Sequence, residues 1–218
     1  MIAFDIETIQ TDDPVIIAEI AATITHPKTM SKAETIAKWA EEEKPKAVEE
    51  AVSKTSFDGT YGRICCIGWA VDRDEPMAIC SANEREVIET FLAAVREAHN
   101  MAGHTFVGHN ITSFDLRFLW QRCIINRIKP STSIPFAAKP WDKAIGDTMT
   151  MWNPERERRI GLDRLCKALG VPTSKGDMDG SKVHKTFLAG ELDKIARYCK
   201  DDVAATRECY LRMIGEYN

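Results

Sequence analysis

The first residues of the chain alternate between apolar and acidic side chains, and this two-residue period predicts a short β-strand. Successive side chains of a strand point to opposite faces, so Phe4 and Ile6 are expected to face the core, and Asp5 and Glu7 the other side. Further strands are predicted where Ile, Val, Cys and Trp gather between turn residues. These strands cover residues 63–71, 77–80, 104–109 and 145–151.

Apolar residues at helical spacing predict the helices. One helix follows Asn83, which begins a capping box, and extends to about residue 99. A second follows Ser113, which is expected to cap it. A short third helix ends at Gly170, and a long last helix covers about 191–214 with an apolar stripe along one side.

The order of these elements predicts the fold class. Strands come first and then alternate with helices, which favours an α/β fold with a mixed sheet flanked by helices. The charged, helical stretch at roughly 12–58 is interpreted as an insertion after the first strand. With 218 residues, 44% of them hydrophobic, and no break in composition, the chain is predicted to form a single domain.

Composition narrows the class of protein. A net charge of -4 argues against a protein that binds DNA through an overall basic surface, but not against a nuclease whose acids are neutralised by bound cations. The seven cysteines include no C-x-x-C pair, so we expect reduced thiols in a reducing compartment. The longest apolar run is too short to cross a bilayer, and Asp5 and Glu7 interrupt any N-terminal signal segment. We therefore expect a cytoplasmic protein.

Asp5 and Glu7 form the first candidate site. Two carboxylates on one face of a strand can bind a hard divalent cation together, because Mg²⁺ and Mn²⁺ prefer oxygen ligands. The alternative is a solvated acidic face without a ligand. The apolar neighbours Phe4 and Ile6 indicate a central strand, and such a strand has few reasons to display acids unless they have cationic partners.

Two more carboxylates lie on predicted helices. Asp115 falls in the first turn of its helix, directly after a strand, where the alternative role is to complement the helix dipole. Asp202 follows Tyr198 by four residues on the last helix, so the phenol and the carboxylate share one side of it. The alternative there is an exposed acid beside a boundary tyrosine on an amphipathic helix.

Three segments, at residues 4–8, 108–115 and 198–203, resemble the exonuclease motifs of the DEDD superfamily, tyrosine subclass. In order they resemble the D-x-E, N-x-x-x-F-D and Y-x-x-x-D motifs. Arg197 stands where the histidine subclass places its histidine. The resemblance is to the proofreading exonuclease domain of family-B DNA polymerases and to its free-standing phage and bacterial relatives. Three motifs in this order are far more specific than any of them alone.

This resemblance implies a ribonuclease-H-like fold in which Asp5, Glu7, Asp115 and Asp202 gather at one edge of the sheet and hold two Mg²⁺ or Mn²⁺ ions. Two such ions can activate a water and stabilise the leaving 3′-oxygen. Asp5 would bridge the ions, Glu7 and Asp202 would complete the nucleophile side, and Asp115 would hold the other ion. The hydroxyl of Tyr198 would orient the attacking water.

Thr8, Asn110 and Phe114 are the candidates for binding the terminal nucleotide, through donors to phosphate and an aromatic face for the sugar or base. A packing or capping role is the alternative for each. We expect a 3′–5′ exonuclease acting on DNA, in its single-stranded form. An RNA exonuclease with the same carboxylates stays an alternative, because that choice depends on how the pocket treats the 2′-hydroxyl. A non-catalytic nucleic-acid-binding module is the other alternative.

Overall fold

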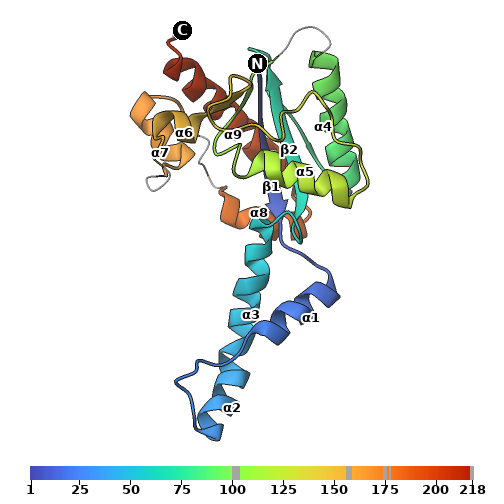
Figure 1. Cartoon of the computed structure of the whole chain (residues 1–218), viewed down its shortest axis with the longest axis vertical. Coiled ribbons are helices and arrows are strands. Elements are labelled where there is room, and N and C mark those ends of the chain that lie inside the picture. Colours follow the sequence, from blue (N-terminus) through green and yellow to red (C-terminus); the bar gives the residue numbers. More distant parts are fainter. Residues whose placement is uncertain (100–103, 156–158, 174–175, 177, 217–218) are drawn as a thin grey trace.

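The computed structural model describes the whole chain except residues 100–103, 156–158, 174–175, 177 and 217–218. Its centre is a five-stranded sheet in the order β3-β2-β1-β4-β5 (Figure 1). The strands are β1 (Ile2–Ile9), β2 (Arg63–Val71), β3 (Met77–Cys80), β4 (Phe106–Gly108) and β5 (Ile145–Asp147). Because β1 pairs antiparallel with β2 and parallel with β4, the sheet is mixed, and the predicted α/β class is confirmed.

Helices cover both faces of the sheet. α4 (Glu84–His99) and α5 (Asp115–Ile125) share a core cluster with Phe4 and Ile6 of β1. α9 (Leu192–Met213) packs on the opposite face, where Val203 meets Ala3. The shorter elements are α6 (Thr148–Trp152), α7 (Leu162–Leu169), α8 (Val183–Leu188) and the 3₁₀ turn η2 (Gly180–Lys182). Within the described part of the chain, none of the helices has both the length and the apolar character that a membrane span needs.

Small residues on the sheet let α9 lie close to it. Gly68 is the antiparallel partner of Asp5 and lies under Cys199. A Cβ added to Gly68 would come within 2.9 Å of the Cys199 Sγ and 3.1 Å of its carbonyl oxygen. Because both distances are too short for a carbon atom, a larger residue at this position would push the helix away. α9 can therefore reach the acids of β1.

Three expectations about element boundaries are wrong. The strand predicted at 104–109 is shorter, since β4 covers only Phe106–Gly108. The predicted strand at 145–151 ends at Asp147, where α6 begins, because the Asp147 carboxylate accepts hydrogen bonds from two backbone N–H groups of that helix at 3.2 and 3.4 Å. Ser113 does not cap α5, since the N-cap position belongs to Phe114 and carries no side-chain hydrogen bond. The strand at 145–151 is predicted too long because composition alone does not distinguish a short apolar strand from the start of a helix.

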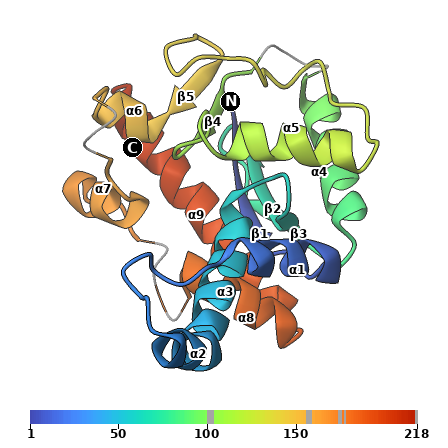
Figure 2. The same ribbon diagram turned by 60° about the horizontal axis from the view of Figure 1, so that its bottom comes forward.

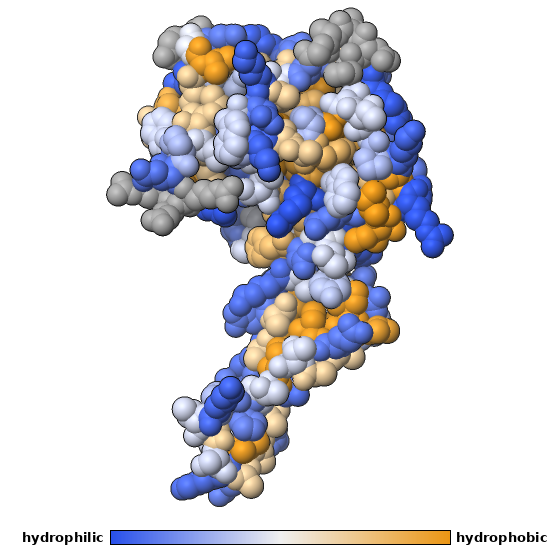
Figure 3. Space-filling model, viewed as in Figure 1, coloured by the Kyte–Doolittle hydropathy of each residue, from blue (hydrophilic) through white to orange (hydrophobic). Residues whose placement is uncertain are grey.

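Between β1 and β2 the chain forms an arm that projects from the body (Figures 1 and 2). The arm consists of α1 (Pro14–Thr23), α2 (Ala33–Glu42), α3 (Lys44–Ser53) and the 3₁₀ turn η1 (Lys54–Phe57). Two hydrogen bonds close its base: Thr8 Oγ1 donates to the Ser56 carbonyl at 2.6 Å, and the Thr11 N–H donates to Thr55 Oγ1 at 2.9 Å. Apolar side chains gather on the arm around α1 (Figure 3), where Val15 is 63% exposed.

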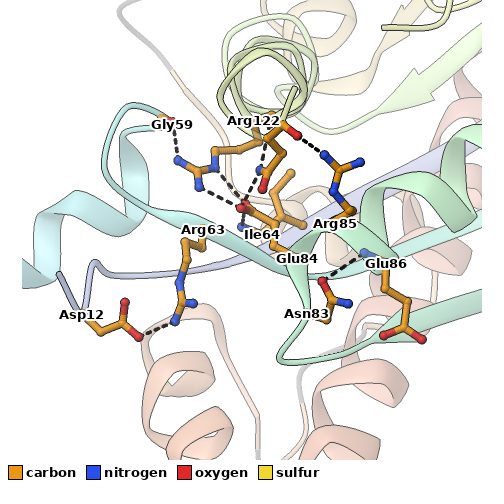
Figure 4. A network of polar contacts seen from close by, with 10 residues as sticks. Asp12, Gly59, Arg63, Ile64, Asn83, Glu84, Arg85, Glu86 and Arg122 are labelled. Carbon is orange, nitrogen blue, oxygen red and sulfur yellow. Dashed lines mark hydrogen bonds and ion pairs between the residues drawn. The ribbon is translucent and has the colours of Figure 1, made fainter. Parts of the chain in front are cut away.

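A buried ion pair joins α4 to α5 (Figure 4). Arg122 donates to both oxygens of Glu84, through Nε at 2.8 Å and Nη2 at 2.7 Å. Glu84 also accepts from the Ile64 N–H at 2.7 Å and from Asn126 Nδ2 at 2.8 Å, while Arg122 donates to the Gly59 carbonyl. Glu84 is therefore neutralised and hydrogen-bonded from within the chain, and the network ties both helices to β2.

Candidate active site

β1 carries the first two acids toward α9. Its pairing with β2 shifts register between Glu7 and Thr8, and irregularities of this kind redirect side chains near functional sites. Glu7 is buried and Asp5 is half-buried. One ligand atom each from Asp5, Glu7 and Cys199 lies within 4.8 Å of the other two. These side chains are therefore close enough to share a cation.

α9 brings Tyr198 and Asp202 to the same place. The two residues are about one helical turn apart, so their side chains point to the same side. Asp202 is one of the groups that raise the pKa of the Tyr198 hydroxyl, so the phenol and this carboxylate interact. Both residues line a cleft of about 320 Å³ together with Asp5 and Glu7.

Asp115, the first residue of α5, is the most deeply buried of the predicted acids, with 2% of its surface exposed. Its Oδ1 accepts a hydrogen bond of 3.2 Å from the N–H of Ile6, the residue between Asp5 and Glu7. Asp115 is not among the residues that line the cleft, yet its charge raises the pKa of both Asp5 and Glu7. All four predicted carboxylates thus lie together.

Burial and mutual repulsion act in the same direction on these carboxyls. Burial raises the pKa of Asp5 and of Glu7 well above the ordinary value, and the neighbouring acids raise it further. Burial also raises the pKa of Asp115 to about 8, against the lowering effect of its backbone hydrogen bonds. The named neighbours that shift these pKa values include no basic side chain. A set of oxygen donors that lacks positive charge fits a hard divalent cation.

Asp147 shapes the loop that leads into Asp115. It is fully buried, and its carboxylate accepts hydrogen bonds from the Asn110 N–H at 3.0 Å, the Thr112 N–H at 3.2 Å and the Thr112 hydroxyl at 2.7 Å. Asn110 has a φ of 68°, a left-handed conformation that asparagine adopts more readily than most residues. Asp147 therefore holds the second motif in place from the end of the neighbouring strand.

The candidates for nucleotide binding divide between two hollows. Thr8 and Phe114 line the carboxylate cleft, whereas Asn110 lines an adjoining hollow of about 630 Å³. Phe57, at the end of the arm, lines both hollows together with Phe114, and the centroids of the two rings lie 6.5 Å apart. The cleft is thus walled on one side by a pair of aromatic rings.

Comparison with protein-family models finds a match over residues 59–215, and the matching family is described as a predicted 3′–5′ exonuclease related to the exonuclease domain of PolB. The chain belongs to this family. The matched residues of the PolB-related exonuclease contain Asp115, Tyr198 and Asp202, whereas Asp5 and Glu7 precede them. The relationship predicted from the three motifs is therefore confirmed at the level of a PolB-related exonuclease.

Among solved structures, the chain is similar to the family B DNA polymerase from the hyperthermophilic archaeon Pyrobaculum calidifontis, with a TM-score of 0.60 and 16% sequence identity. The superposition covers 98% of this chain and 24% of the polymerase chain, so this chain spans about a quarter of that length. The likeness concerns the fold, and it confirms the predicted ribonuclease-H-like architecture. No curated protein matches the chain significantly.

Three residues near this site escape prediction from the sequence. Asp147 has a usable signal, because an acid at a strand end followed by Thr148 and Thr150 is typical of a helix cap. Cys199 is interpreted only as a core thiol, yet its Sγ lies 3.8 Å from Asp5 Oδ2. Phe57 has no signal of its own, since its position depends on how the arm folds back.

Proposed function

We propose that this chain is a two-metal-ion 3′–5′ exonuclease of the DEDD tyrosine subclass that acts on single-stranded DNA, and that it forms one exonuclease domain. The proposal rests on the convergence of buried carboxylates from β1, α5 and α9 beside Tyr198, with no basic side chain among the neighbours that shift their pKa values. The residues that would hold two Mg²⁺ or Mn²⁺ ions are Asp5, Glu7, Asp115 and Asp202. The DNA polymerase that shares the fold supports DNA as the substrate.

The chain's own contribution to the chemistry centres on Tyr198. When bound, two divalent cations supply water activation and stabilisation of the leaving 3′-oxygen. Burial raises the pKa of Tyr198, with Asp202 and Glu7 adding to the rise, so the phenol keeps its proton at neutral pH. The protonated phenol can accept a hydrogen bond from a water in the cleft through a lone pair of its oxygen. Tyr198 would orient the water in this way, without removing a proton.

The residues around the carboxylates would position the terminal nucleotide. Phe114 would offer its ring to the sugar or base, and Asn110 would offer its side-chain amide to a phosphate in the adjoining hollow. The Thr8 hydroxyl is engaged with the Ser56 carbonyl, so its role would be to hold the arm against the cleft.

The decisive experiment is digestion of matched single-stranded DNA and RNA, each labelled at the 5′ end, in Mn²⁺ and in Mg²⁺. We expect a ladder that shortens from the 3′ end of the DNA, is abolished by EDTA, and returns when excess Mn²⁺ is added. A ladder from RNA alone would replace DNA by RNA as the substrate. Binding of DNA without hydrolysis in either metal would favour a non-catalytic module.

A further inference from the structure

Three hollows adjoin one another along one side of the molecule. The carboxylate cleft shares Phe57 and Phe114 with the hollow that contains Asn110. That second hollow shares Arg159 with a third, of about 510 Å³, which is lined by Trp152 and Arg164 among others. Because each hollow shares lining residues with the next, the three lie next to one another, and we call them together the path.

The path combines the two features by which proteins bind single-stranded nucleic acid. Arginines line its second and third hollows, and these arginines are the groups that can bind backbone phosphates: Arg117, Arg159 and Arg164. In the part of the chain that the structure describes, none of them takes part in an ion pair. Trp152, 44% exposed, offers an aromatic face on which a base can stack.

A second basic hollow, of about 350 Å³, lies on the other side of the cleft and shares Tyr198 with it. Two of its basic residues are in ion pairs, Lys194 with Glu191 at 2.6 Å and Lys182 with Asp179 at 3.3 Å, and Asp201 lines the same hollow. Tyr198 is its only aromatic lining residue among those described. This hollow is therefore a poorer fit for a polyanionic strand.

The second motif connects the path to the catalytic acids. His109 Nε2 donates a hydrogen bond of 2.9 Å to the carbonyl of Ile160, and Nδ1 lies 2.9 Å from the Thr148 hydroxyl. The residue after His109 lines the second hollow, and the residue before Ile160 is Arg159. The segment that carries Arg159 is thus fastened to the loop that leads into Asp115.

From this geometry we infer that the path binds the single strand upstream of its 3′ end. The inference rests on the proposed function for the position of that end. The terminal nucleotide lies against Phe57 and Phe114, Arg117 and Arg159 bind the next phosphates, and a base stacks on Trp152. A duplex does not fit this arrangement, because its bases are paired and stacked on one another.

Binding is tested by the fluorescence anisotropy of a 5′-labelled oligothymidylate of about 12 nucleotides, in an Asp5→Asn background that prevents digestion. We expect Trp152→Ala to raise the Kd about tenfold, and Trp152→Phe to restore most of the affinity. Arg159→Ala should raise the Kd and lower the slope of log Kd against log salt by about one. The matched control is Lys194→Ala in the opposite hollow, which should change neither quantity.

Hydrolysis assays with Asp5 intact distinguish binding of the strand along the path from the chemical step. Trp152→Ala and Arg159→Ala should each slow digestion of the long strand more than hydrolysis of a dinucleotide, because a dinucleotide is too short to contact the whole path. Wild-type affinity in both variants, or loss of affinity in Lys194→Ala instead, would overturn the path. If the wild type hydrolyses neither substrate while binding still depends on Trp152, the path is supported and the proposed catalysis fails.

Discussion

The molecule buries acidic side chains in two places. In one place the acid has a positively charged partner, and in the other the neighbouring charges are negative. Glu84 is held by both arms of Arg122 and by two further donors. Glu7 and Asp115 lie as deep as Glu84 and Asp5 is half-buried, but the charges around these three acids are also negative. Taking an ion out of water costs several kcal/mol, which a partner can offset. Burial alone therefore does not mark a functional acid, whereas burial without a partner does.

The largest expected effect comes from removing a charge at the uncompensated site. Asp5→Asn should lower the rate of DNA hydrolysis roughly a thousandfold or more, because losing a metal ligand forfeits several kcal/mol of charge stabilisation. Its melting temperature in EDTA should stay the same or rise, since repulsion with Glu7 and Asp115 is relieved. Asp201→Asn, at the exposed neighbour of Asp202, is the matched control and should keep the wild-type rate.

The same experiment at the compensated site should change stability strongly. Arg122→Met should lower the free energy of unfolding by about 3–5 kcal/mol, because Glu84 is left buried without its partner. The double variant Glu84→Leu with Arg122→Met should be less destabilised than the single one. Lys167→Met removes an exposed helical pair with Asp163 and should cost about 0.5 kcal/mol. Denaturant titration measures the free energy of unfolding of all three variants. Equal losses in the three would contradict the importance of the buried ion pair.

The pH dependence of stability should distinguish the two regions more finely. The Asp115 carboxyl has a pKa near 3.8 when unfolded and about 8 when folded, so the folded state holds the extra proton between these values. In EDTA the free energy of unfolding should therefore fall as the pH rises from about 4 to about 8. Added Mn²⁺ should reduce this fall, and Asp115→Asn should reduce it without metal. A flat profile in EDTA would contradict the uncompensated burial of these acids.

The smallest expected effect is at Tyr198. Tyr198→Phe removes the hydroxyl that interacts with Asp202 and that would orient the water, and it leaves every carboxylate in place. We expect kcat to fall about tenfold with little change in KM, since one orienting hydrogen bond is lost. Single-turnover digestion with saturating enzyme provides the measurement. A rate equal to that of the wild type would remove Tyr198 from the chemistry.

Much of the fold can be predicted from the sequence because its elements are periodic. β2, β3 and α4 carry apolar patterns long enough to define their ends, and the alternation in β1 places Asp5 and Glu7 on one face. The order of strands and helices then predicts the mixed sheet. The acids come together because α9 packs against the face of β1 that bears them.

What escaped prediction depends on contacts between segments far apart in the chain. Asp147 has a local signal for a cap, but its hydrogen bonds to Asn110 and Thr112 follow from the pairing of β4 with β5. Phe57 reaches the cleft only because the arm folds back on itself. The periodicity of apolar residues does not predict where an irregular segment folds back. The position of a single residue at the end of such a segment is therefore known only from the structure.

The closed base of the arm bears on how far the length of the arm can change. The chain leaves the sheet after Ile9 and returns to it at Arg63, and the hydrogen bond from Thr8 to Ser56 joins the two sides of the arm at its base. The arm beyond this junction should tolerate insertions and deletions, because a longer loop adds little to the entropy cost of closing it. Shortening it need not disturb the pairing of β1 with β2. A segment from another protein could replace the arm between β1 and β2, provided that it ends in the turn that carries Phe57 to the cleft.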